Sequence, residues 1–459
     1  MTTIKLDPGA ALLLDALHGA GHAAYAVGGC VRDSLLGLDP HDWDLCTSAR
    51  PEQVMALFGE ETCIPTGLQH GTVTVKQGGR LYETTTFRTE GAYSDGRHPD
   101  AVCFVPDVRE DLARRDFTIN AMAYSAEEGL IDPFGGRDDL AAHLVRAVGE
   151  PERRFEEDAL RILRLYRFAA RFGFAIDPAT GAAARALGPH LDCVSAERIQ
   201  EELLKLLAAP RPGRYLEPAV LAVVLPELEP EKQPERFAEL CRTIDRIEPT
   251  AENVPARLAA LLCPLGEAGA RKALRKLKCS NALTDEVTAL EREAGGGAGS
   301  FLLPRSRDRW AGSSSEDRPL GWDPAAAGSR AGDGMARTVS EEEAPGTPGS
   351  EMQLTAKRLL GRYELPTIQR LTALCSARHP EQTGAFAALR AEAERLTAEN
   401  ACCRVSQLAV NGRDLMAAGA RPGPGLRQVL NALLEAVITG QTPNEKDALL
   451  AAAAQFSAS

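Results

Sequence analysis

Two acidic residues, Asp42 and Asp44, stand two positions apart, directly before a short apolar run. Residues two apart on a strand point to the same side, so we expect both carboxylates on one face. Two carboxylates beside a triphosphate are what a two-metal phosphoryl-transfer centre requires, because the metals bridge the attacking and leaving oxygens. Magnesium suits such a site, since it takes few carboxylates together with phosphate oxygens and water. The spacing therefore predicts a magnesium-dependent catalytic pair.

A glycine pair, Gly28 and Gly29, ends the apolar run 23–27, and a short helix-like stretch follows it. A strand that ends on two glycines and feeds a helix lets a polyanion approach the bare backbone and the helix N-terminus. A dinucleotide-binding fold is not indicated, because no G-x-G-x-x-G pattern follows. The glycines and the acidic pair together predict a site for a nucleoside triphosphate.

A third carboxylate is a candidate for the same place. Two strand-like segments, 72–76 and 80–87, flank the sequence Gln-Gly-Gly and predict a hairpin. Glu83 lies on its second arm, from where its side chain could approach the acidic pair. The alternative, an exposed glutamate on a strand, stays open.

Composition limits the class of protein. The length of 459 residues suggests about three domains. The net charge of −12 excludes a nonspecific nucleic-acid coat but allows local basic patches. The 11 cysteines include no C-x-x-C pair, which disfavours a disulfide framework or a zinc site and favours a reducing, cytoplasmic environment. Neither a membrane-spanning run nor a signal peptide is indicated.

The first part of the chain alternates short strands and helices. We expect a helix at 51–58, with proline in its first turn, and a long mobile loop at 88–105, which is polar and rich in glycine. A further helix is expected over 111–124. It would carry Arg114, Arg115 and Asp116 together, either as a functional cluster or as a solvated one.

From residue 152 onward the pattern is almost entirely helical. The stretch 155–172 predicts one helix with a buried apolar face. On it, Asp158 and Arg161 would be neighbours, three residues apart. Few acidic residues follow Asp158, so Arg164, Arg167 and Arg171 are expected to keep donors free for an anion or a base edge; a plain solvated face is the alternative.

Two further segments have unusual composition. A basic cluster at 271–278 is a candidate contact for an RNA backbone, or a plain surface face. Residues 294–350 are rich in glycine and proline and predict a disordered insertion.

Five stretches, in order, resemble the motifs of the CCA-adding tRNA nucleotidyltransferases, the class that also includes bacterial poly(A) polymerases. They are GGCVRD at 28–33 with DWD at 42–44, RRDFTINA at 114–121, DPFGG at 132–136 with DDL at 138–140, EDALR at 157–161 with the following arginines, and SAERI at 195–199. The sequence LAVNGRDL at 408–415 is similar to the C-terminal part of the family. The segment 294–350 departs from the family pattern.

The resemblance implies an α+β protein. A mixed α/β nucleotidyltransferase head at 1–145 would be followed by all-helical parts. These are a neck at 146–215 that recognises the base, a body at 216–293, and a body and tail at 351–459 that bind tRNA, with the insertion 294–350 between the last two.

The resemblance also implies the activity: untemplated addition of C, C and A to the 3′ end of tRNA from CTP and ATP. Asp42 and Asp44 would hold Mg²⁺, with Glu83 as a third catalytic carboxylate. The nucleotide-binding residues would be Gly28, Gly29, Arg32, Arg115, Asp116, Asn120, Asp158, Arg161, Arg164 and Arg167. Asp158 would accept from the exocyclic amine of cytosine or adenine, and Arg161 would donate to the ring nitrogen.

Other functions stay open at this stage. Poly(A) polymerase and partial, A-adding or CC-adding, nucleotidyltransferases use the same chemistry, although the loop 88–105 resembles the complete loop of the family, which favours addition through the final A. An RNA-binding module without catalysis is disfavoured by the intact acidic pair, and a His-Asp phosphohydrolase by the absence of a second His-acid pair at suitable spacing. The sequence specifies neither an oligomeric state nor a tRNA footprint.

Overall fold

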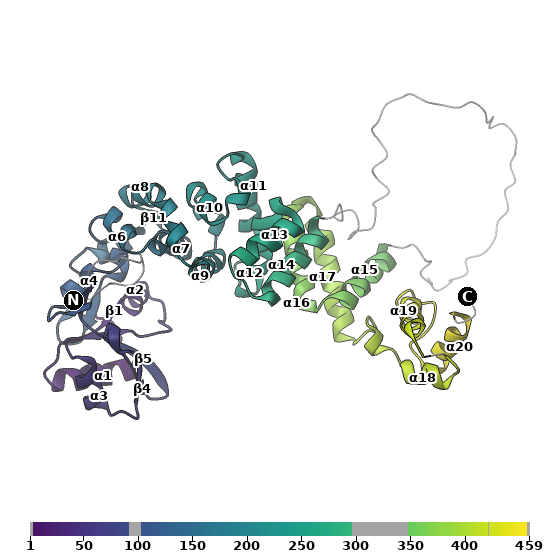
Figure 1. Cartoon of the computed structure of the whole chain (residues 1–459), viewed down its shortest axis with the longest axis horizontal. Helices are drawn as coiled ribbons and strands as arrows, with labels where there is room; N and C mark the ends of the chain where they lie inside the picture. Colours follow the sequence, from purple (N-terminus) through teal and green to yellow (C-terminus); the bar gives the residue numbers. More distant parts are fainter. Residues whose placement is uncertain (1–2, 91–101, 296–347, 421, 457–459) are drawn as a thin grey trace, which may run out of the picture. The chain divides into compact units, whose positions relative to one another are not determined.

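The computed structural model describes residues 3–90, 102–295, 348–420 and 422–456 (Figure 1). The chain divides into two compact units, Met1–Glu291 and Arg292–Ser459. No helix among these described residues is long and apolar enough to cross a membrane. The candidate site residues named above all belong to the first unit.

A mixed sheet forms the centre of the head, in the order β3-β4-β5-β2-β1-β8-β9. Its strands are β1 (Ala24–Val27), β2 (Leu45–Thr47), β3 (Cys63–Gly67), β4 (Thr72–Gln77), β5 (Arg80–Thr86), β8 (Ala123–Ser125) and β9 (Gly129–Ile131). The predicted hairpin is confirmed as β4 and β5, in which Gln77 faces Arg80 across a two-glycine turn. Both glycines have positive φ, 58° and 80°, which the tight hairpin turn requires.

Five helices and a small ribbon complete the described part of the head. The helices are α1 (Pro8–Gly19), α2 (Gly29–Leu35), α3 (Pro51–Phe58) and α4 (Val108–Ala113), followed by the short helix α5 (Gly136–Ala141). The prediction of a helix at 51–58 is confirmed. The expected loop 88–105 is wrong at both ends, because β6 (Arg88–Glu90) and β7 (Val102–Phe104) pair antiparallel there; its centre, 91–101, lies outside the described residues.

The expected helix over 111–124 is also wrong. Helix α4 ends at Ala113, a 3₁₀ turn η2 (Thr118–Asn120) follows, and residues 123–125 form strand β8. The reason is burial on all sides. Ile119 and Met122 are fully enclosed, and β8 pairs with β1 on one side and β9 on the other, which overrides a helical pattern.

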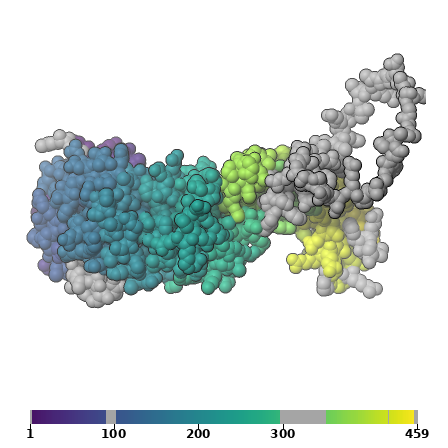
Figure 2. Space-filling model, turned by 90° about the horizontal axis from the view of Figure 1, so that it is seen from above, coloured from purple at the N-terminus to yellow at the C-terminus, as the bar shows by residue number. Residues whose placement is uncertain are grey.

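Helices make up the rest of the first unit (Figure 1), apart from the short parallel pair β10 (Leu144–Val145) and β11 (Ala175–Ile176). They are α6 (Pro151–Glu157), α7 (Leu160–Phe172), α8 (Pro178–Ala186), α9 (Ala196–Leu207), α10 (Pro218–Val224), α11 (Pro234–Arg246), α12 (Val254–Leu262), α13 (Gly266–Lys276) and α14 (Asn281–Gly295). Figure 2 shows the head and these helices as one continuous packed surface, coloured from purple to teal.

The stretch 155–172 is two helices rather than one. The break falls at Asp158, whose backbone is extended, with φ −147° and ψ 103°. Its side chain accepts the backbone N–H of Leu160 at 3.1 Å. Aspartate side chains that bond nearby backbone in this way offer an alternative to the helical ladder, which explains why the helix stops here.

The second unit is helical in its described residues. It contains α15 (Pro348–Arg362), α16 (Leu365–Arg378), α17 (Thr383–Ala398), α18 (Gly412–Ala417), α19 (Pro424–Ile438) and α20 (Lys446–Phe456). Helices α14 and α15 occupy residues 294–295 and 348–350, at the two edges of the expected insertion 294–350. Residues 296–347 lie outside the described residues.

One buried cation links three helices of the first unit, α9, α11 and α12. Arg257 on α12 is fully enclosed and donates to the backbone carbonyls of Leu207 at 2.6 Å, Ala209 at 2.5 Å and Ile247 at 2.5 Å. Two of these carbonyls lie at the end of α9 and one lies directly after α11. Arg257 therefore replaces the partners that the ends of two helices would otherwise lack.

Replacing Arg257 with methionine should lower the free energy of unfolding of the first unit by about 3 kcal/mol or more, because several buried carbonyls each lose a partner at about 1–3 kcal/mol. Urea unfolding followed by circular dichroism measures this. The matched control is Arg242→Met, which removes an exposed ion pair with Glu239 and should cost under about 1 kcal/mol. Equal losses in the two variants would contradict the role assigned to Arg257.

Candidate active site

The acidic pair lies directly before β2 and not on the strand itself, which begins at Leu45. Trp43 is buried, whereas Asp42 and Asp44 on either side of it are exposed, so both carboxylates lie on the same side of the chain. The carbonyl of Asp44 accepts the N–H of Val27 at 3.0 Å, which fixes the pair beside the end of β1. Strands β2 and β5 are parallel, with Leu45 opposite Thr84, and this register brings Glu83 next to Asp44.

Electrostatics shows that these carboxylates interact. Crowding by protein atoms raises the pKa of Asp44 although the side chain keeps contact with solvent, and the charge of Glu83, followed by that of Asp42, raises it further; Arg115 acts in the opposite direction. A cation would relieve this repulsion. Among the described residues no group of three His, Cys, Asp or Glu side chains forms a metal cage. Magnesium is commonly held by one or two carboxylates together with substrate phosphates, so the residues fit that ion.

The glycine pair lies against a cation. Gly28 has φ 78°, and a Cβ built there would stand 2.7 Å from a terminal nitrogen of Arg115. The guanidinium of Arg115 makes one long contact with Asp111, at 3.5 Å, and its buried Nε has no hydrogen-bond partner among the described residues. Arg115 therefore has donors available beside bare backbone and close enough to Asp44 to influence its pKa, an arrangement suited to a phosphate.

Arg32 flanks the second glycine. One of its terminal nitrogens lies 3.6 Å from the position of a Cβ at Gly29. The side chain is buried; its Nε donates to Asp33 at 2.7 Å and another terminal nitrogen donates to Asn120. Arg32 is thus next to the predicted phosphate site, but its orientation is set by protein contacts.

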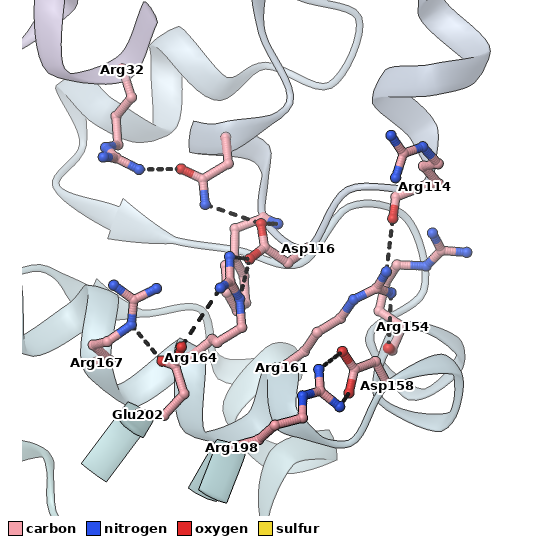
Figure 3. Close-up of polar contacts among 12 residues, drawn as sticks. Arg32, Arg114, Asp116, Arg154, Asp158, Arg161, Arg164, Arg167, Arg198 and Glu202 are labelled. Carbon is pink, nitrogen blue, oxygen red and sulfur yellow. Dashed lines mark hydrogen bonds and ion pairs between the residues drawn. The ribbon is translucent and has the colours of Figure 1, made fainter. Parts of the chain in front are cut away.

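Asp116 is the centre of a polar network (Figure 3). Its carboxylate accepts the N–H of Phe117 at 2.8 Å, the amide of Asn120 at 3.0 Å, and Arg164 through two nitrogens at 2.9 and 2.7 Å. Burial alone would raise the pKa of Asp116, but Arg164 and the hydrogen bond from Asn120 lower it to about 2. Asp116 is therefore ionised at neutral pH, and through Asn120 it is linked to Arg32.

The arginines of α7 are not free, contrary to the expectation from sequence. Arg167 donates to Glu202 on α9 at 2.5 Å, and Arg164 lies 3.7 Å from the same carboxylate. Arg171 donates to Asp33 on α2 at 3.1 Å. The acids come from other elements of the fold, so the local sequence of α7 did not reveal them.

Asp158 and Arg161 are not neighbours on one helix, and that expectation is corrected here. Figure 3 shows Asp158 facing Arg198, which donates to its two oxygens at 3.3 and 2.8 Å. Arg161 points elsewhere and donates to Glu157 at 2.8 Å and to the carbonyls of Arg154 at 3.0 Å and Arg114 at 2.9 Å. The helix break at residue 158 separates the two side chains and gives each its own support.

Three supporting acids were missed from the sequence as site residues: Asp33, Glu157 and Glu202. Glu202 carried a signal, because it follows Arg198 by four residues and so falls on the same face of α9. Buried arginines on α7 require acidic partners. Helix α9 offers one, because Glu202 lies among the apolar residues Ile199, Leu203 and Leu206.

Comparisons with known proteins define the class first. The Poly A polymerase head domain family matches residues 24–146, and the RNA and SrmB-binding site of polymerase A matches residues 173–232. The tRNA nucleotidyltransferase domain 2 family matches residues 365–453. The head is therefore a nucleotidyltransferase domain of the poly(A) polymerase type.

Full-length relatives define the family. The CCA-adding enzyme of Lactobacillus helveticus is 34% identical over 439 residues, covering 95% of this chain and 94% of its own. That of Geobacillus stearothermophilus is 34% identical over 443 residues, covering 96% of this chain and 94% of its own. The chain belongs to the CCA-adding enzymes, which are tRNA nucleotidyltransferases.

Solved structures agree with this assignment. The Bacillus stearothermophilus CCA-adding enzyme in complex with CTP superposes with a TM-score of 0.74 at 30% identity, covering 99% of this chain and 98% of that one. The Thermotoga maritima enzyme complexed with tRNA shares the fold, with a TM-score of 0.63 at 20% identity and 98% and 96% coverage. The predicted fold class, an α+β head followed by helical parts, is confirmed.

Proposed function

We propose that this chain adds C, C and A, one nucleotide at a time and without a nucleic-acid template, to the 3′ end of tRNA, using CTP and ATP and releasing pyrophosphate. The observation that carries the proposal is the position of Asp42 and Asp44 on one side of the chain, next to Glu83 and to the free donors of Arg115 at Gly28. Support also comes from the family and from a relative solved with CTP.

Asp42 and Asp44 would hold divalent ions, for which Mg²⁺ is our choice because of the oxygen-only donors. Such ions, when bound, lower the pKa of the attacking 3′-hydroxyl and neutralise the leaving pyrophosphate. The protein itself would bind and orient the nucleotide. Arg115 and Arg32, with the backbone of Gly28 and Gly29, would bind the triphosphate.

The turn after α4 would orient the nucleotide. Asp116 and Asn120 would fix the ribose and the triphosphate through the network that joins them to Arg32. Arg164 and Arg167 fix the position of that network. Arg164 donates to Asp116, and both arginines form ion pairs with Glu202. Positioning of this kind, rather than covalent chemistry, is the main contribution of a protein to phosphoryl transfer.

Base selection would use the hydrogen-bonding capacity that remains at Asp158 and Arg161. A carboxylate has about four acceptor positions. Arg198 and the N–H of Leu160 fill three of them, which leaves one on Oδ2 of Asp158 for an exocyclic amine. Arg161 keeps its Nε and one terminal N–H for a ring nitrogen. On their Watson–Crick edges, uracil and guanine do not present an exocyclic amine beside a ring acceptor, and they would be rejected.

A surface for tRNA is proposed on the helical parts. Within the basic cluster, Arg271 pairs with Asp285, and Lys278 with Glu197, while Lys272, Arg275 and Lys276 are exposed. We also propose the division into head 1–145, neck 146–215, body 216–293 and body with tail 351–459, on the basis of the resemblance to the family. The protein would work in the cytoplasm, in keeping with a cysteine pattern that favours a reducing compartment.

The close approach of Arg115 to the backbone of Gly28 provides one prediction. Gly28→Ala should raise KM for CTP and ATP about tenfold, because the added methyl would displace Arg115 and because φ is 78°. Steady-state kinetics with a tRNA primer measures it. The matched control is Gly37→Ala, which has a similar φ of 72° but open space around the Cβ, and its KM should stay near that of the wild type. An equal rise in KM in the two variants would contradict a role for the displacement of Arg115 and would indicate backbone strain instead.

The proposed function is tested by incubating the protein with tRNA that ends before its CCA, Mg²⁺ and labelled CTP or ATP, and reading products at single-nucleotide resolution. Three additions in the order C, C, A are expected. Long A tails without C would instead identify a poly(A) polymerase, and arrest after CC or addition of A alone would identify a partial enzyme. The absence of any extension would reject nucleotidyl transfer to this primer.

A further inference from the structure

The far end of α7 contacts the phosphate side of the site. Arg171 donates to Oδ2 of Asp33 on α2, and the guanidinium of Arg32 lies 4.9 Å from the ring centroid of Phe172. Both Arg171 and Phe172 lie at the end of α7, well beyond the motif EDALR at 157–161. The contact joins the neck to the residue that flanks Gly29.

Asp33 is shared between two cations. Its Oδ1 accepts the Nε of Arg32 at 2.7 Å, and its Oδ2 accepts Arg171 at 3.1 Å. Each oxygen therefore faces a different arginine, so the rotation of the carboxylate is fixed from both sides. If one partner is removed, the carboxylate can turn, and the Nε of Arg32 loses a fixed acceptor.

The ring of Phe172 likewise contacts both guanidinium groups, those of Arg32 and Arg171. The guanidinium carbons of Arg32 and Arg171 lie 4.9 and 5.0 Å from its ring centroid. The ring is itself stacked on Phe168, at 6.3 Å between centroids and 2° between planes, and Phe168 lies 5.3 Å from Arg32. Two parallel rings thus present a fixed surface to the buried guanidinium of Arg32, and cation–π contacts of this kind gain strength when desolvated.

We propose that Arg171 and Phe172 are positioning residues that hold Arg32 beside Gly29 and thereby determine how tightly the triphosphate binds. The inference rests on the proposed function in one respect, the assignment of Arg32 to the triphosphate. The side chain of Arg171 is 44% exposed, so its ion pair contributes little to global stability and its removal leaves a folded protein.

The test uses direct binding of CTP and ATP to the full chain in Mg²⁺ by calorimetry, without tRNA, alongside primer extension. Arg171→Ala and Phe172→Leu should each weaken binding and raise KM for both nucleotides about fivefold, with kcat within about twofold of the wild type, since a phosphate contact is common to both substrates. Arg171→Lys and Phe172→Tyr should restore most of the affinity, because they keep the charge and the ring.

The matched control is Arg185→Ala on α8, which removes an arginine of similar exposure, 51%, that lies 3.8 Å from Glu217. Its nucleotide affinity should be unchanged. Unchanged affinity in Arg171→Ala and Phe172→Leu, or an equal loss in Arg185→Ala, overturns the inference. If the wild type binds CTP but does not extend tRNA, the proposed function fails, while the binding measurements still decide the role of Arg171 and Phe172.

Discussion

Asp44→Asn should lower the rate of cytidine addition to tRNA about a thousandfold or more. Metal ions stabilise the charge of a phosphoryl-transfer transition state by several kcal/mol, and each loss of about 1.4 kcal/mol costs a factor of ten in rate. Asparagine keeps the size of the side chain but removes the charge that would hold the ion. Single-turnover extension of a tRNA primer at saturating CTP measures the effect.

Loss of folding is not an explanation for that result. Crowding and the neighbouring carboxylates raise the pKa of Asp44, so the folded state disfavours its charge, and a neutral replacement should leave thermal stability unchanged or improved. Asp39→Asn is the matched control, because it alters an exposed acid in the same connection between α2 and β2. Near-normal extension by Asp44→Asn would remove the proposed chemistry from this site.

Asp158→Ala should abolish most of the discrimination between correct and incorrect bases. The ratio of kcat/KM for CTP to that for UTP is expected to fall about a hundredfold or more, because polar groups left unpaired against the wrong base are what give large selectivity. Two effects combine. Cytosine and adenine lose the acceptor for their amine, and uracil and guanine lose a repulsive carboxylate. Competition between CTP and UTP in primer extension measures the ratio.

Two variants sharpen this experiment. Arg198→Met leaves the carboxylate of Asp158 in place but removes the guanidinium that fixes both of its oxygens, and should give an intermediate loss of selectivity. Asp192→Ala, an exposed acid of the neck, should change nothing. Unaltered selectivity in Asp158→Ala would assign base recognition to other residues.

Local sequence patterns predict those structural features that depend on neighbouring residues. The hairpin around two glycines and the proline-initiated helix at 51–58 both follow from periodicity and turn chemistry. The resemblance of five motifs identified the family and its fold. For these features, neighbouring residues contain most of the information.

The remaining features depend on contacts between distant parts of the chain. The local pattern predicts helix where β8 lies, because the burial of β8 between two other strands is not visible in 111–124 itself. The arginines of α7 were expected to be free because Asp116 and Glu202 are 48 and 35 residues away from their partners. The break at Asp158 depends on a side-chain bond that competes with the helix, which a periodic apolar pattern does not show.

The interruption between α6 and α7 has a further consequence for two substrates of different size. Asp158 joins the end of one helix to the start of the next, because its N–H donates to the carbonyl of Arg154 at 3.5 Å and its carbonyl accepts the N–H of Arg161 at 3.0 Å. Its carboxylate is held in one place by Arg198. A one-ring pyrimidine and a two-ring purine place their amines at different depths in a pocket. Since Asp158 is fixed by Arg198 and Leu160, we expect the incoming nucleotide, rather than the carboxylate, to shift so that either amine reaches the one acceptor position left on Oδ2.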